Sequence, residues 1–137
     1  MVYKYALTPI IAWFAAGTLK FIVNYIRFSR QAVGLIGNGG FPSTHTTVIS
    51  STVFLIGLTE GMTAPVFGLG VAVLMITIID ALGIRRAVGK QASVINRHIL
   101  PGNTTEPALR ERQGHNPVEV LGGLVLGFIV AYLLHQL

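Results

Sequence analysis

The sequence predicts an all-α integral membrane protein, a bundle of four transmembrane helices plus an interfacial amphipathic helix. Hydrophobic residues make up 52% of the 137 residues and charged residues only 11%, whereas a soluble domain carries about 25% charged residues. The mean hydropathy is +0.66. The apolar residues gather in four runs close to the ~20 residues that a spanning helix needs. The length favours one domain, residues 1–137.

Four spans are expected along the chain: Leu7 to Ile26, Ser43 to Gly61, Ala64 to Leu82 and Val118 to Leu134. The second is the weakest, because it is rich in Ser and Thr. A short break around Gly61 and Pro65 joins it to the third as a tight hairpin. We expect the first span to be retained rather than cleaved as a signal peptide, because its apolar stretch is too long and contains Lys20.

Each expected span carries an ionisable side chain near one end. Lys20 lies toward the end of the first span and His45 near the start of the second. Asp80 lies near the end of the third, and Glu119 near the start of the fourth. Because antiparallel spans alternate in direction, these four ends meet at one membrane face. Ionisable residues are costly in lipid and indicate function; side chains that only snorkel to the surface are the alternative.

The basic residues also gather at this face, because both long connections lie there. These connections contain Arg27, Arg30, Arg85, Arg86, Lys90, Arg97, Arg110 and Arg112, and only Lys4 lies on the opposite side. The positive-inside rule then places the charged face in the cytoplasm and both termini outside. Arginines that bind a phosphate would give the same distribution.

Charge and cysteine content narrow the partners. The net charge of +5 favours anionic lipid head groups or a phosphorylated substrate, and the apolar runs argue against nucleic acid. The chain has no cysteine, which excludes disulfides, a thiolate metal site and a cysteine nucleophile.

Residues 84–100 predict a two-faced helix that rests in the membrane interface. The basic stripe is Arg86, Lys90 and Arg97, and the apolar stripe is Ile84, Val88, Ile95 and Ile99. Residues 101–103, Pro-Gly-Asn, are expected to end the helix. Attraction to anionic lipid explains Lys90 and Arg97 equally well. Arg85 and Arg86 directly follow the span with Asp80 and are better placed to reach a substrate.

The segment from Gly39 to Thr47 has the composition of a loop that enters a helix. Amides and the positive dipole at a helix N-terminus bind phosphate. Ser43 and Thr44 would add hydroxyl donors, and His45 would protonate a leaving oxygen. A capped helix start with an interfacial histidine is an equally good interpretation.

A second motif begins at Gly114. Pro117 suits the first helical position, Asn116 the cap and Glu119 the acid of a capping box. That structural role explains Asn116 and Glu119 but not His115. His115 and Glu119 are four residues apart, so the carboxylate can accept an imidazole N–H. Such a bond sets the tautomer and leaves the other ring nitrogen free to attack phosphorus.

These segments resemble the type 2 phosphatidic acid phosphatase superfamily. Its first motif is Lys, six residues, then Arg-Pro; Lys20 and Arg27 match, with Phe28 in place of proline. Because they lie two helical turns apart, these cations project from one face, where they could cradle phosphate oxygens. The second motif, Pro-Ser-Gly-His, matches residues 42–45 with Thr44 in place of glycine.

The third motif of the superfamily ends in His, three residues, then Asp. His115 and Glu119 match it, with Glu in place of Asp, and Leu109 stands where the motif has an arginine. The candidates to replace that arginine are Arg110, Arg112 and the Arg85–Arg86 pair. The divergent small membrane branch of the superfamily is a closer match, through residues 39–45, 80–92 and 114–120.

The resemblance implies metal-independent hydrolysis of a lipid phosphomonoester through a phosphohistidine. His115 would be the nucleophile, Glu119 its orienting acid and His45 the general acid. The phosphate would be held by Lys20, Arg27, Ser43, Thr44, Arg85 and Arg86. Asp80 has no role in the superfamily scheme, and we expect it to position Arg85 or Arg86. With a site facing the cytoplasm of a bacterial inner membrane, phosphatidylglycerophosphate is the preferred substrate.

Two other functions remain open. His45, Asp80, His115 and Glu119 form a candidate ligand set for a divalent metal, as in a metal-dependent lipid or prenyl phosphate phosphatase. A lipid carrier that binds head groups without cleaving them is the non-enzymatic alternative. Gly123 and Gly127 suit close helix contact, either within the bundle or in a homo-oligomer.

Overall fold

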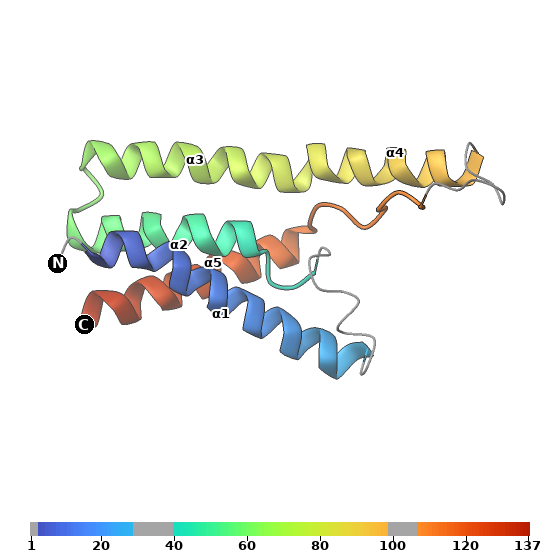
Figure 1. Cartoon of the computed structure of the whole chain (residues 1–137). Coiled ribbons are helices and arrows are strands. Elements are labelled where there is room, and N and C mark those ends of the chain that lie inside the picture. Colours follow the sequence, from blue (N-terminus) through green and yellow to red (C-terminus); the bar gives the residue numbers. More distant parts are fainter. Residues whose placement is uncertain (1–2, 29–39, 99–106) are drawn as a thin grey trace.

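The computed structural model describes residues 3–28, 40–98 and 107–137. In these ranges the chain forms helices and loops and no strand: α1 (Tyr3–Phe28), α2 (Thr44–Thr59), α3 (Pro65–Leu82), α4 (Ile84–His98) and α5 (Pro117–Gln136) (Figure 1). The predicted all-α class is confirmed. Arg30, Gly39, Ile99 and the expected helix end at 101–103 lie outside the described residues.

The helices of the bundle alternate in direction (Figure 1). Both termini lie at one end, so the last turns of α1 and α3 and the first turns of α2 and α5 lie at the other. Among the described residues, three helical stretches are long and apolar enough to cross a membrane: Tyr3–Arg27, Pro65–His98 and Pro117–Gln136. With 16 residues, α2 is about 24 Å long and is shorter than the ~30 Å hydrocarbon core.

Helix α2 lies in the middle of the bundle, in contact with α1, α3 and α5. Its buried side chains include Thr46, Thr47, Ser50 and Ser51. Three of these hydroxyls donate to backbone carbonyls, for example Thr47 Oγ1 to the Ser43 carbonyl and Ser51 Oγ to the Val48 carbonyl, each at 2.9 Å. The fourth, Thr46 Oγ1, donates to Ser43 Oγ. Small side chains whose hydroxyls are hydrogen-bonded within the protein allow helices to approach closely in lipid. This explains why the least apolar of the four expected spans is the central helix.

The small polar side chains of α2 pack against α5. A Cβ at Gly123 would lie 2.7 Å from the Ser43 carbonyl oxygen, and one at Gly127 would lie 2.0 Å from Ser50 Oγ. The two glycines therefore pack against α2 inside the bundle, which was one of the two roles expected for them. The other faces of α1, α3 and α5 expose large apolar side chains such as Phe14, Leu69 and Leu133. Such a surface is typical of an integral membrane protein.

Helix α4 begins directly after Gly83 and continues approximately in the direction of α3, beyond the end of the bundle (Figure 1). A segment from residue 107 runs back beside it to α5. Asn96 holds this segment with two bonds to Leu109: Asn96 Nδ2 donates to the Leu109 carbonyl and the Leu109 amide donates to Asn96 Oδ1, both at 2.8 Å. The amphipathic helix is present, and its position in the membrane interface stays a prediction.

Candidate active site

The four ionisable side chains expected at one end of the bundle do lie there. Lys20 is near enough to Glu119 for their charges to interact. The charges of Lys20, Asp80, Arg85 and His115 all act on His45. The alternation of the helices therefore brings these groups to one end of the molecule. The positive charges of Lys20 and Arg85 interact with both histidines.

His115 and Glu119 are held by a set of hydrogen bonds at the start of α5. His115 Nδ1 lies 2.9 Å from Glu119 Oε2. The same carboxylate oxygen accepts the Asn116 amide at 3.1 Å, and the Glu119 amide donates to Asn116 Oδ1 at 2.9 Å. Glu119 is thus a capping-box acid and the partner of His115 at once. Because Nδ1 faces the carboxylate, Nε2 is the ring nitrogen left for chemistry.

The backbone around His115 is held from the α3–α4 junction. The His115 amide donates to the Ala81 carbonyl at 3.0 Å. Gly114 has φ +77°, and a Cβ there would lie 2.8 Å from the Arg86 amide nitrogen and 2.9 Å from the Ala81 carbonyl. Glycine meets both requirements, positive φ and close approach. His115 is only 8% exposed, and this burial lowers its pKa while the bond to Glu119 opposes the shift.

The start of α2 is attached to the start of α5. The Ser43 amide donates to the Glu119 carbonyl at 2.8 Å. Ser43 Oγ caps α2 by accepting from the Thr46 amide at 3.4 Å and from Thr46 Oγ1 at 2.9 Å. The Phe41 ring packs on Gly122, where a Cβ would lie 2.1 Å from the ring.

These contacts give Ser43 a structural role. Its side chain is fully buried, and its amide and hydroxyl already bond to protein atoms. It therefore caps and anchors α2, and its expected part in holding phosphate stays a prediction. Thr44, in contrast, lines a pocket and belongs to the first helical turn, where amides have no acceptor within the helix.

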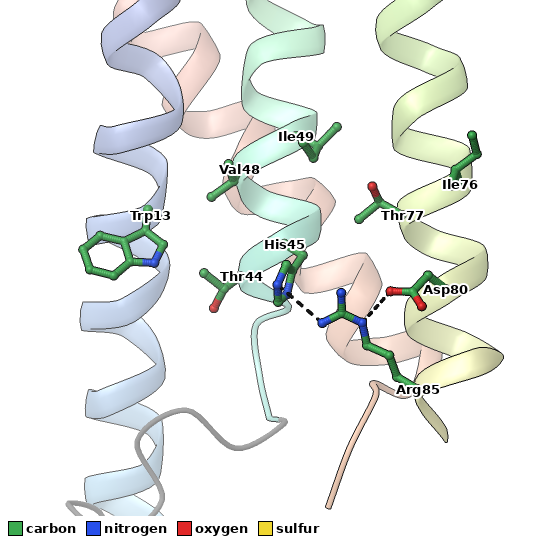
Figure 2. Close-up of a pocket in the computed structure, with 9 residues that line it drawn as sticks. All are labelled: Trp13, Thr44, His45, Val48, Ile49, Ile76, Thr77, Asp80 and Arg85. Atoms are coloured by element: carbon green, nitrogen blue, oxygen red, sulfur yellow. Dashed lines mark hydrogen bonds and ion pairs between the residues drawn. The ribbon is translucent and has the colours of Figure 1, made fainter. Parts of the chain in front are cut away.

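That pocket has a volume of about 450 Å³ and lies among α1, α2 and α3 (Figure 2). Its lining residues are Trp13, Thr44, His45, Val48, Ile49, Ile76, Thr77, Asp80 and Arg85. At its polar end, Arg85 Nε donates to Asp80 Oδ2, and Arg85 Nη1 lies 3.4 Å from His45 Nε2. Asp80 thus pairs with Arg85, one of the two arginines considered for it.

Two other predicted phosphate ligands lie farther out. Arg27 is exposed and lies about 10 Å beyond Lys20 along α1. Arg86 is also exposed, and the base of its side chain faces Gly114. The arrangement of the described residues therefore favours Lys20 and Arg85 over Arg27 and Arg86 as the cations nearest the histidines.

Sequence reasoning missed Trp13 and Thr77, which line the pocket. The signal was present in the spacing. Trp13 lies seven residues before Lys20, and Thr77 lies three residues before Asp80. Both intervals return to the same face of a helix, so each residue belongs to the face that already carries an ionisable group.

The four side chains considered as metal ligands, His45, Asp80, His115 and Glu119, each contact another group of the protein, and His45 Nε2 lies 3.4 Å from Arg85 Nη1. Asp80 is paired with Arg85, and Glu119 is bonded to His115 and to the Asn116 amide. Within residues 3–28, 40–98 and 107–137, no three His, Asp or Glu side chains come together in a group that could hold a metal ion. The structure thus does not assemble the proposed ligand set.

Comparisons with known proteins agree with the resemblance seen in the motifs. The family model described as "Divergent PAP2 family" matches residues 3–130. The uncharacterized membrane protein YuiD of Bacillus subtilis is 27% identical, over 92% of this chain and 92% of its own length. No solved structure shows significant similarity to the chain.

Proposed function

Because the chain belongs to the divergent PAP2 family, we propose that it hydrolyses a lipid phosphomonoester through a phosphohistidine at His115. The observation that carries this proposal is the 2.9 Å contact between His115 Nδ1 and Glu119 Oε2 at the end of the bundle that also holds His45. It leaves a buried imidazole with one nitrogen oriented by a carboxylate and the other available to attack.

The reaction proceeds in two displacements. In the first, His115 Nε2 attacks phosphorus, the bond from phosphorus to the ester oxygen breaks, and protonated His45 gives its proton to the departing lipid alcohol. In the second, neutral His45 takes a proton from water while the water oxygen attacks phosphorus. The N–P bond then breaks, which releases inorganic phosphate and restores His115.

Lys20 and Arg85 stabilise the charge that builds on the phosphoryl oxygens. The charges of both act on the two histidines, and Asp80 orients the Arg85 guanidinium. Thr44 contributes from the first turn of α2. Arg27 and Arg86 lie at the margin, where they would attract an anionic substrate before it reaches the histidines.

The substrate we propose is phosphatidylglycerophosphate, reached from the cytoplasmic face of a bacterial inner membrane. This orientation rests on the arginines and lysines of the two long connections. The first alternatives are phosphatidic acid, and a prenyl phosphate if the site faces outward. A lipid carrier remains the non-enzymatic alternative, because the same cations would also hold a head group that is not cleaved.

Phosphate release from lipid phosphomonoesters by the purified chain in detergent tests the proposal, with His115→Ala as the control. We expect release by the wild type in the presence of a chelator, and an acid-labile phosphoenzyme during turnover. Release that disappears with a chelator and returns with a divalent ion would favour the metal-dependent alternative. Release equal to the His115→Ala background for every lipid would favour the carrier.

A further inference from the structure

The pocket at His45 continues away from the charged end as an apolar groove. The backbones of α1 and α3 both come close to that of α2, but in the part of the chain that the structure describes they do not come close to each other. Their separation leaves α2 as the floor and α1 and α3 as the two walls (Figure 2). Val48 and Ile49 form the floor, with Trp13 on one wall and Ile76 on the other.

The groove is open on its outer side. Trp13 is 57% exposed and Ile76 is 67% exposed, on helices whose outer surfaces are otherwise apolar. In an integral membrane protein such an opening faces lipid, so an apolar chain can enter sideways without crossing water. A groove for a water-soluble phosphoester would instead need polar walls and an opening toward the aqueous side.

The polar and apolar ends of the groove follow one another along the helices of the bundle. Ile49 lies one turn beyond His45 on α2, and Ile76 lies one turn before Asp80 on α3, each about 6 Å deeper in the bundle. Trp13 lies about 10 Å deeper than Lys20 on α1. His45, Arg85 and Asp80 thus lie toward the charged end of the bundle, at the bottom of Figure 2, and the apolar lining lies above them in that view. This is the order of head group and acyl chain in a phospholipid.

From these observations we infer that the groove between α1 and α3 binds an acyl chain of a lipid phosphomonoester that enters from the bilayer, with its phosphate at Arg85 and His45. This inference rests on the proposed function and specifies its substrate as a membrane-embedded lipid. Asp80 occupies Arg85 Nε, and the guanidinium has further N–H donors for phosphate oxygens. The groove volume of about 450 Å³ suits a chain segment, since small-ligand pockets measure about 300–1,000 Å³.

Trp13 is the only tryptophan of the chain and lines the groove, so its fluorescence reports what lies beside it. The assay uses His115→Ala protein, so that lipid is not consumed, in phosphatidylcholine vesicles. Phosphatidic acid with brominated acyl chains is added as a minor component and compared with phosphatidylcholine brominated at the same positions. We expect the phosphatidic acid to quench Trp13 several-fold more strongly at equal mole fraction. Equal quenching by the two lipids would overturn the inference.

The charged end is tested in the same assay. Arg85→Gln should abolish the preference for brominated phosphatidic acid, because the groove then keeps its apolar lining but loses the guanidinium. Lys90→Gln, which removes a cation of α4 outside the groove, should retain the preference. A preference that survives Arg85→Gln, or that falls equally in both variants, would contradict the assignment of the phosphate to Arg85.

The apolar part is tested by kinetics. Val48→Phe narrows the groove and should raise the KM for a long-chain lipid phosphate by about tenfold, with little change for a short-chain analogue. Val125→Phe makes the same substitution at an exposed position of α5 and should change neither. If Val48→Phe raised the KM equally for long-chain and short-chain substrates, the groove would not be the acyl-chain site.

The two proposals can fail separately. Selective quenching without phosphate release from any lipid would support the groove and refute the hydrolysis. Phosphate release from long-chain lipids without selective quenching would support the hydrolysis and overturn the groove.

Discussion

The two histidines lie at the same end of the bundle but in opposite surroundings. His115 is 8% exposed, with its amide bonded to Ala81 and its ring bonded to Glu119. His45 is exposed, and its Nε2 lies at a long distance, 3.4 Å, from Arg85 Nη1. The first is fixed between α3 and α5, and the second lines an open pocket. This difference suits a fixed nucleophile and a general acid that must meet a substrate which arrives and leaves.

The same contrast extends along the bundle. On the side of α5, glycines bring the helix into direct contact with α2, so that Gly123 and Gly127 leave no room for a Cβ. On the other side, α1 and α3 stay apart across the pocket. The closed side holds the geometry of His115 and Glu119. The open side leaves His45 and Arg85 in the lining of a pocket.

The largest expected effect is that of His115→Ala. Phosphate release should fall to background and the phosphoenzyme should not form, because no other group at this position can accept the phosphoryl group. Folding should persist, since Glu119 still accepts the Asn116 amide. The elution profile in detergent checks folding, and a phosphate assay checks turnover. Wild-type turnover in this variant would show that His115 is not the nucleophile.

His45→Ala should lower kcat about 10²- to 10⁴-fold, the range for loss of a general acid. The phosphoenzyme should still form from substrates whose leaving group needs no proton, such as an aryl phosphate. Comparison of aryl and alkyl phosphate substrates therefore separates proton donation by His45 from formation of the phosphoenzyme. If both substrates lose activity equally, His45 does not act on the leaving oxygen.

Gly123→Ala should lower the free energy of unfolding by about 1–3 kcal/mol, because the added Cβ would lie 2.7 Å from the Ser43 carbonyl and 2.9 Å from Thr46 Cβ. Gly68→Ala is the matched control on α3, where a Cβ meets nothing within 4 Å. Thermal unfolding in detergent measures both variants. Equal midpoints would show that α2 and α5 are not as closely packed as the contrast requires.

The smallest effect concerns pH. Burial lowers the pKa of His115 below its usual value of about 6.5, so the nucleophile stays neutral to lower pH, and the acidic limb of kcat/KM should lie below that value. Glu119 opposes this shift, so Glu119→Gln should move the limb to still lower pH while it reduces the rate.

The linked effect on stability has a definite sign. The unfolded histidine binds its proton at higher pH than the folded one, so stability is complete above about pH 6.5 and declines as the pH falls toward the folded pKa. A pH series of unfolding midpoints for wild type and His115→Ala measures this. In the kinetic experiment, an acidic limb of kcat/KM above pH 6.5 would contradict its assignment to His115. A limb that moves to higher pH in Glu119→Gln would contradict it too.

Several features were predictable because they depend on local order in the chain. Apolar runs of spanning length and their alternation are properties of the sequence, so the all-α bundle and the shared end of Lys20, His45, Asp80 and Glu119 followed from it. The capping box at Asn116 and Glu119 followed for the same reason, since its partners are three residues apart. The divergent branch of the superfamily was recognised from residues 39–45, 80–92 and 114–120, and the divergent PAP2 family is confirmed over residues 3–130.

Other features required the tertiary structure, because they depend on which faces the helices turn toward each other. The sequence does not show what Ser43 contacts, whereas the structure shows that its Oγ caps α2 by accepting the Thr46 amide and that its amide donates to the Glu119 carbonyl. Arg85 and Arg86 are adjacent in the sequence, and the structure shows that Arg85 is the one paired with Asp80. The groove beside Trp13 exists because α1 and α3 both rest on α2 without meeting, a spacing that no local pattern encodes.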